Sequence, residues 1–126
     1  MRVAMLALAF VLAISGPVAA GPLQDGLAAH ERGDFALAMQ WYRKAADQGN
    51  ANAQSILGVM YANGRGVTKD DVQAYMWVNL AAAGTSDADV REQAQKTRDA
   101  FAARMTPAQI GEAQRLSREW KPTSGR

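Results

Sequence analysis

The chain has 126 residues, of which 14 are basic, 12 are acidic and one is histidine, and it contains no cysteine. The absence of cysteine excludes disulfides, thiolate nucleophiles, iron–sulfur clusters and cysteine-based zinc sites, and one histidine cannot build a His-rich metal centre. With a formal net charge of +2, an apolar fraction of 48% and basic residues spread along the chain, the composition indicates one small folded domain and disfavours nucleic-acid binding.

The first 20 residues have the layout of a secretory signal peptide. Arg2 precedes an apolar run at 3–14, Ser15-Gly16-Pro17 breaks a helix, and Val18-Ala19-Ala20 offers small residues for cleavage. The run is shorter than the roughly 20 residues of a membrane-spanning helix. We therefore expect cleavage after Ala20, no membrane span in the mature chain, and a periplasmic or secreted location. An uncleaved anchor and a buried helix are the alternatives, and a lipoprotein is excluded because no cysteine follows the cut.

An internal repeat determines the predicted architecture. Five residues of the segment that begins at Asp34 recur 36 positions later, in the segment that begins at Asp70. The pairs are Asp34 and Asp70, Ala38 and Ala74, Trp41 and Trp77, Ala45 and Ala81, and Ala46 and Ala82. Upstream the offset falls to 32, where Gly26 matches Gly58, so the second unit holds an insertion of four residues at Gly64–Val67. A period of this length is typical of helix-turn-helix solenoids, whose units pack on one another.

Apolar residues within each unit recur at helical spacing. The first helix of the second unit carries its stripe at Ala53, Leu57, Gly58 and Tyr61. Small residues such as Gly58 let helix axes approach closely. Gly49 and Gly84 follow the second helix of each unit, where we expect left-handed C-terminal caps.

Two further helices are expected after the repeats. Ser86 or Asp87 can cap the first, and Thr106-Pro107 with Gln109 forms a capping box for the second. Their apolar stripes are Val90, Ala94, Thr97 and Phe101, and Ile110, Ala113, Leu116 and Trp120. We expect this pair to cover the apolar end of the last repeat. The expected fold is an all-α solenoid of about six helices, with repeats at 21–49 and 50–84, capping helices at 85–120 and a flexible tail at 121–126.

The second repeat closely resembles a Sel-one-like repeat, a relative of the tetratricopeptide repeat. The family pattern runs A-x-x-x-L-G-x-x-Y-x-x-G-x-G-V, then an aspartate, then A-x-x-W and A-A. The matching residues are Ala53, Leu57, Gly58, Tyr61, Gly64, Gly66, Val67, Asp70, Ala74, Trp77, Ala81 and Ala82, followed by Gly84. Residues 23–49 look like a shorter relative without the G-x-G-V loop, and Met105–Ile110 resembles the ending of small exported bacterial members. The resemblance implies a helical-hairpin solenoid that serves as a non-catalytic adaptor of the bacterial envelope without a cofactor.

The candidate catalytic and ligand-binding motifs are weak. His30 is the sole candidate general base, and since no serine or acid at an informative spacing accompanies it, we interpret it as a residue at a helix C-terminus. Gly64-Arg65-Gly66 follows no strand and lacks the G-K-[ST] of a phosphate loop, so we expect its glycines to allow positive φ in a turn. Asp87-Ala88-Asp89 begins like a calcium loop, but the residues that follow do not supply the remaining ligands. The tryptophans are expected in the core, with stacking on sugar or peptide as the alternative.

The candidate partner-binding residues lie on the first helix of the second repeat, between its packing positions. They are Asn52, Ser55, Val59 and Asn63. By resemblance, first helices build the concave surface of tetratricopeptide-like arrays, and amide side chains there can hydrogen-bond the backbone of a bound peptide. A solvated helix face is the alternative for each of these residues.

We therefore expect an adaptor that binds a protein or peptide partner. A second hypothesis is a carbohydrate- or cell-wall-associated binding or hydrolytic protein that uses exposed tryptophan and a carboxylate. A third is a structural subunit that is stable only as a homo-oligomer, because two repeats are fewer than the three or so that usually stabilise an array.

Overall fold

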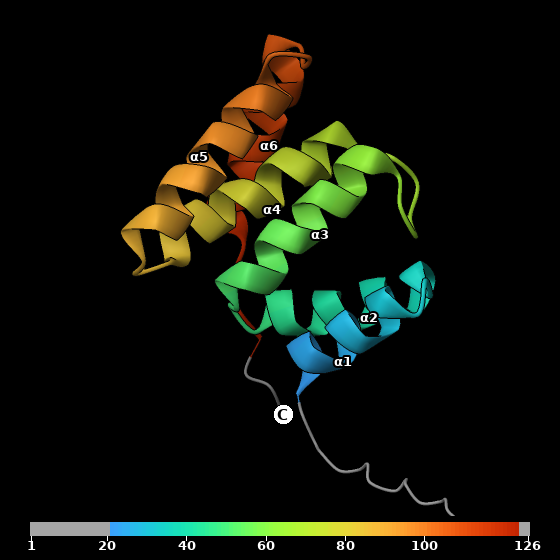
Figure 1. Cartoon of the computed structure of the whole chain (residues 1–126). Coiled ribbons are helices and arrows are strands. Elements are labelled where there is room, and N and C mark those ends of the chain that lie inside the picture. The colour runs from blue at the N-terminus through green and yellow to red at the C-terminus, as the bar shows by residue number, and fades with distance from the viewer. Residues whose placement is uncertain (1–20, 124–126) are drawn as a thin grey trace, which may run out of the picture.

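The computed structural model describes residues 21–123, which form six α-helices joined by short turns and contain no strand (Figure 1). The helices of this range are α1 (Pro22–Glu31), α2 (Phe35–Asp47), α3 (Ala51–Asn63), α4 (Asp71–Gly84), α5 (Ala88–Ala102) and α6 (Pro107–Glu119). The predicted all-α class is confirmed. The expected signal peptide and the last three residues of the expected tail lie outside the described residues. Within these residues, no helix is long and apolar enough to cross a membrane.

Side-chain caps begin five of the six helices in the described range. The Asp87 carboxylate accepts the backbone N–H groups of Asp89 and Val90, and Thr106 and Gln109 form the expected capping box. Each cap satisfies N–H groups that the first turn of a helix leaves unpaired. The predicted starts of both C-terminal helices are therefore confirmed.

The two expected glycine caps have different outcomes. Gly49 follows α2 with a φ of 95°, as expected. The expectation for Gly84 is wrong, because Gly84 is the last residue of α4 and the chain leaves the helix through Thr85 at a φ of −82°. The Thr85 N–H bonds to the Ala81 carbonyl, and extended backbone then leads directly into the cap of α5, so no left-handed residue is needed.

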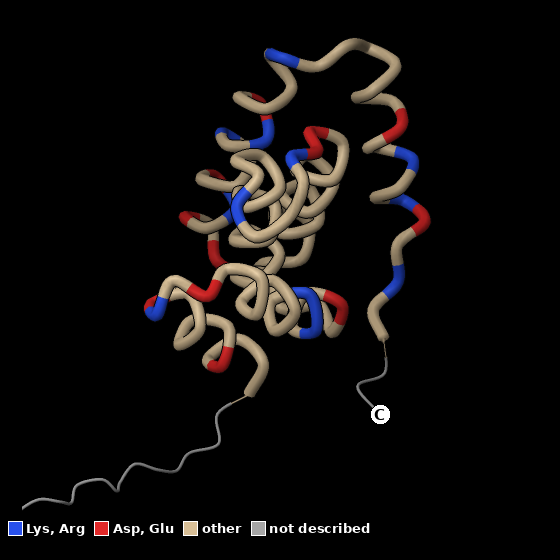
Figure 2. Tube along the Cα trace, turned by 90° about the vertical axis from the view of Figure 1, so that its right-hand side faces the viewer, with Lys and Arg blue, Asp and Glu red and all other residues tan. Residues whose placement is uncertain are grey.

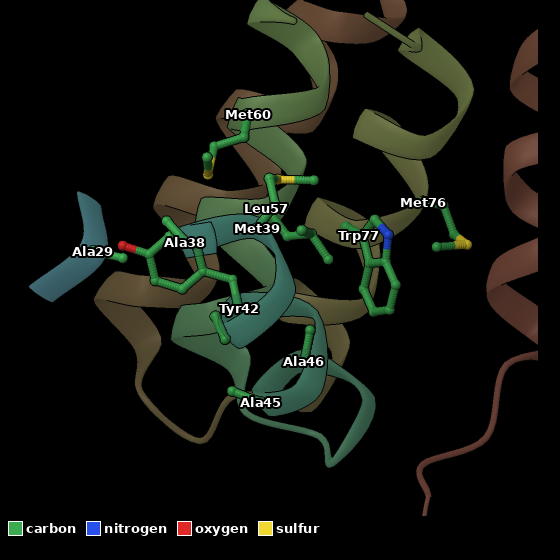
Figure 3. Packing of buried hydrophobic residues seen from close by; sticks show 11 residues of the cluster. Ala29, Ala38, Met39, Tyr42, Ala45, Ala46, Leu57, Met60, Met76 and Trp77 are labelled. Atoms are coloured by element: carbon green, nitrogen blue, oxygen red, sulfur yellow. The ribbon is translucent and has the colours of Figure 1, made fainter. Parts of the chain in front are cut away.

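The helices stack in chain order as far as α4, since α2 packs between α1 and α3, and α3 packs on α4. Helices α5 and α6 both pack against α4, as expected of a capping pair. One buried cluster, which includes Tyr42, Leu57 and Trp77, joins the first repeat to the second (Figure 3). A second cluster, which includes Val78 and Phe101, joins α4 to the capping helices. The core thus consists of two clusters that both involve α3 and α4, and half-buried Tyr61 packs against each of them.

The repeat positions mainly serve this packing. Buried residues among them are Ala53, Leu57, Gly58, Ala74, Trp77, Ala81 and Ala82, whereas Tyr61 is half-buried and Gly84 is exposed. Gly58 allows α3 to lie close to α4, because an added Cβ would overlap Val78 Cγ2 and lie 2.9 Å from the Ala74 carbonyl oxygen. Small residues at the helix contact therefore set the spacing of the second repeat.

The three tryptophans occupy different environments. Trp77 is 1% exposed, as expected of a core residue. Trp120 is half-buried and packs edge to face on Trp77, with ring centroids 6.3 Å apart. Trp41 is half-buried on α2, with Lys44 Nζ at 5.7 Å from its ring centroid, so the core expectation holds for Trp41 only in part.

The chain after α6 returns to the first repeat. The Thr123 N–H donates to the Asp47 carbonyl at the end of α2, with a distance of 2.7 Å. Although Thr123 belongs to the segment expected to be a flexible tail, it is held against α2. Together with the contact between Trp120 and Trp77, this bond fastens the C-terminal helix to both repeats.

Arg104, in the turn between α5 and α6, connects the capping helices to the second repeat. Its guanidinium donates to the Asp71 carboxylate at 2.9 Å and to the Ala62 carbonyl at 3.3 Å, and Lys69 Nζ lies 3.3 Å from the same carboxylate. Burial alone raises the pKa of Asp71, but the hydrogen bonds and charges of Arg104 and Lys69 outweigh burial and hold this pKa below its ordinary value.

Candidate partner-binding groove

A groove of about 780 Å³ runs across α1, α3 and α5, the first helix of each helical pair. Helix α3 lies between the other two (Figure 1) and forms the floor, while α1 and α5 form the walls. The lining residues are Leu23, Leu27 and His30 from α1; Asn52, Ser55, Ile56, Val59, Met60 and Asn63 from α3; Asp89, Val90, Gln93, Ala94 and Thr97 from α5; and Arg65 and Val78.

All four residues predicted to bind a partner line this groove. Asn52, Val59 and Asn63 are exposed and Ser55 is half-buried, all on one face of α3. The helical period places them there, because residues three and four apart share a face, whereas the buried Leu57 packs in the core. Binding by these residues stays a prediction.

The floor and one wall of the groove expose apolar side chains. Leu27 and Val59 are the two exposed large hydrophobic residues of the described range, at 42% and 40%, and both line the groove. They also occupy matching positions of the two repeats, 32 residues apart. Half-buried Leu23, Ile56 and Val90 extend the apolar surface. A contiguous apolar surface with a polar rim is typical of an interaction site.

Sequence reasoning missed the contribution of the neighbouring helices. Leu27 could have been found from its match to Val59 in the repeat alignment. The stripe of α5 was expected only to cover the last repeat, and its buried Ala94 lies in the core cluster with α4. Val90 and Thr97, from the same stripe, are half-buried and line the groove. Helix α5 therefore serves both as a cap and as a groove wall.

The insertion of the second repeat forms one end of the groove. Gly64 and Gly66 have φ values of 66° and 75°, as expected for a turn. Gly66 lies directly on the backbone of Phe35, since an added Cβ would be 2.5 Å from the Phe35 carbonyl oxygen. This contact places Arg65 beside Phe35, with the guanidinium carbon 4.9 Å from the ring centroid. A positive charge is thus held at the groove end.

His30 lies at the same end of the groove. Its ring packs edge to face on Phe35, with centroids 5.1 Å apart, and its Nδ1 shares a hydrogen bond of 3.2 Å with the Tyr42 hydroxyl. Burial, and then the charge of Glu31, raises the pKa of Tyr42, which keeps its hydroxyl protonated. Within the described part of the chain, the hydrogen-bond partner of His30 is thus the buried Tyr42 and not a serine or carboxylate.

Apart from the groove, residues 21–123 form a smaller pocket of about 320 Å³ between α4 and α6. Basic and acidic residues are interspersed along the Cα trace instead of gathering in one patch (Figure 2). None of the three tryptophans lines the groove. In this range, no three histidine, aspartate or glutamate side chains come together as metal ligands. The groove is thus the main candidate for function.

Comparison with known proteins agrees with this architecture. A family model described as Sel1 repeat matches residues 20–50 and 51–86. An "Exopolysaccharide production negative regulator" of Rhizobium leguminosarum bv. viciae is 32% identical over 84 residues, which cover 56% of this chain and 32% of that protein. The crystal structure of a protective antigen present in uropathogenic Escherichia coli strains, described as displaying an SLR fold, matches with a TM-score of 0.67 and 31% identity over 79% of this chain and 21% of that chain. The chain thus spans about a third and about a fifth of these two proteins, respectively.

Proposed function

Because the chain belongs to the Sel1 repeat family, whose members generally mediate protein–protein interactions, we propose that it holds a segment of a protein partner in the groove across α1, α3 and α5. The single observation that carries this proposal is the exposure of Leu27 and Val59 at equivalent positions of the groove. Covering the exposed part of each side chain would contribute about 1 kcal/mol. Binding would therefore need several apolar contacts along the groove, with Asn52 and Asn63 bonding the partner at its edges.

We place this interaction in the bacterial envelope. The charged start, apolar run, helix breaker and small residues of positions 1–20 support export, and the Rhizobium relative is named as a regulator of exopolysaccharide production. Cell fractionation with N-terminal sequencing tests the location. A periplasmic or secreted chain that begins at Gly21 is the expected result, and a chain that keeps Met1 in the cytoplasm would contradict it.

Site-specific photocrosslinking in the native cell tests the groove itself. A photoreactive residue at Val59 should capture a partner, whereas one at Ala108, exposed in the first turn of α6 and outside the groove, should not. Introducing Leu27→Asp on the α1 wall should abolish capture from Val59, because the partner would have to desolvate a carboxylate. Equal capture from both positions, or capture that survives Leu27→Asp, would contradict the proposal.

The two alternative hypotheses receive less support. A carbohydrate site would need an accessible tryptophan ring, but Trp77 is buried and neither Trp41 nor Trp120 lines the groove. A structural homo-oligomer stays a prediction, which light scattering of the purified protein tests. We expect a monomer, because α5 and α6 already cover α4 at the end of the stack.

A further inference from the structure

The two ends of the groove carry opposite charges. Helices α3 and α5 begin on the same side of the molecule and run in the same direction (Figure 1). Asp89, in the first turn of α5, therefore lies at the end where α3 begins, and Arg65 lies at the end where α3 stops. Neither side chain has an ion-pair partner among residues 21–123. Both charges are thus available to a bound molecule.

The dimensions of the groove fit one helix. Helix α3 has 13 residues, which corresponds to a length of about 20 Å. A helix of that length and about 10 Å in width has a volume of roughly 1,600 Å³. A groove of about 780 Å³ is smaller than such a helix, so a bound amphipathic helix would cover its apolar face there and leave its other face exposed.

Helix dipoles and charges favour one orientation of that helix. The negative C-terminal ends of α1 and α3 lie near Arg65, so the positive N-terminus of a bound helix is favoured there. Acidic residues in the first turn of the bound helix would stabilise its own N-terminus and pair with Arg65. Basic residues in its last turn would reach Asp89 at the other end. Phe35 holds the Arg65 guanidinium in place, which reduces the entropy lost when the pair forms.

We propose that the groove binds an amphipathic helix of its protein partner antiparallel to α3, with an acidic first turn at Arg65 and a basic last turn at Asp89. This inference rests on the proposed function and adds the conformation, polarity and charge of the bound segment. Apolar contacts with Leu27 and Val59 supply the affinity, and the two charges determine the direction.

Two synthetic peptides of identical composition test the direction. Each is a helix about 14 residues long with leucines on one face. One has glutamates in its first turn and lysines in its last, and the other has these charges exchanged. Fluorescence anisotropy gives the Kd of each peptide for the full chain and for the double variant Arg65→Glu, Asp89→Lys. Both substituted residues are exposed, and circular dichroism of the variant checks that it folds.

The measured quantity is the Kd of the peptide with lysines first divided by the Kd of the peptide with glutamates first. This ratio is compared between the wild-type protein and the double variant. This comparison cancels the difference in helicity between the peptides. Two exposed ion pairs should make the wild-type ratio about 3- to 10-fold larger than the ratio of the double variant. Raising the salt from about 0.05 M to about 0.5 M should shrink that difference. The neutral variant Arg65→Gln, Asp89→Asn should give an intermediate ratio.

The remaining outcomes separate this inference from the proposed function. A Kd ratio that is the same in both proteins overturns the proposed direction. If Val59→Asp then abolishes the binding of both peptides, the groove is still supported as a binding site. If the wild-type protein binds neither peptide, the helical occupant is overturned. Photocrosslinking from Val59 then decides the proposed function independently, because it uses the native partner and no synthetic peptide.

Discussion

Replacing Gly58 by alanine should destabilise the protein, although alanine is the better helix former. An added Cβ would lie 2.9 Å from the Ala74 carbonyl oxygen and 3.3 Å from the Val78 nitrogen, and would overlap Val78 Cγ2. Two of these atoms belong to the backbone of α4, so the helices must separate. Overpacking of this kind costs up to about 3 kcal/mol, and the gain in helix propensity returns about 1 kcal/mol. We expect the free energy of unfolding to fall by about 2 kcal/mol.

Gly111→Ala is the matched control. Gly111 lies inside α6, is exposed, and has no atom within 4 Å of an added Cβ. The same substitution should therefore raise the free energy of unfolding by about 0.5–1 kcal/mol. Opposite signs for two helical glycines would separate the close approach of α3 and α4 from intrinsic propensity.

Urea unfolding followed by circular dichroism measures both effects. In thermal unfolding, the melting temperature of Gly58→Ala should be about 10 °C lower than that of the wild-type protein. Adding Val78→Ala should recover part of the loss, since it removes the overlapping methyl group but leaves the Ala74 carbonyl in place. If Gly58→Ala is as stable as the wild-type protein while Gly111→Ala behaves as expected, the close contact between α3 and α4 does not exist.

Three further predictions concern buried or tethering groups. The carboxyl group of Asp71 has a lowered pKa in the folded protein, so its contribution to stability is complete above about pH 4 and lost as the pH falls through the lowered pKa. In urea titrations at decreasing pH, Asp71→Asn should lose less stability than the wild type. The Gln54 Nε2 donates to the Ala46 carbonyl, while its Oε1 is buried without a partner among the described residues. Gln54→Met should therefore leave the melting temperature equal or higher. A fall of more than about 1 kcal/mol in the free energy of unfolding would contradict this. Trp120→Ala should cost about 2 kcal/mol in thermal unfolding by removing the ring that packs on Trp77, and Trp120→Phe should retain most of that energy.

Helix positions and caps could be predicted from the sequence because they depend on local chemistry. Asp87 and Thr106 cap the N–H groups of residues two or three positions away, which spacing alone reveals. Gly84 shows the limit of this reasoning, since its residue type suits a left-handed cap but the short path into α5 requires extended backbone. Thr123 shows another limit, because its bond to Asp47 joins residues 76 positions apart and depends on the path of α6.

The face of α3 that lines the groove was predictable for a related reason. Repeat spacing assigns Leu57 to packing, and the helical period leaves Val59 on the other side of α3 from Leu57. The groove walls depend on how α1 and α5 lie beside α3, which no local pattern contains. The sequence pattern therefore predicts Arg65 only as part of a turn, whereas the structure places it at the end of the groove.

In the proposed complex, the insertion at Gly64–Val67 would combine packing with recognition of the partner. Gly66 can lie on the Phe35 backbone only because it has no side chain, and this contact determines where the preceding residue points. The side chain of Arg65 makes no contribution to that backbone contact, so its identity is free to change. If Arg65 contacts the partner as proposed, substitutions there would alter partner choice while the repeats stay packed. Any side chain at Gly66 would displace the loop and the charge together. The variable position of the G-x-G pattern is thus suited to specificity because the glycines on either side fix its place.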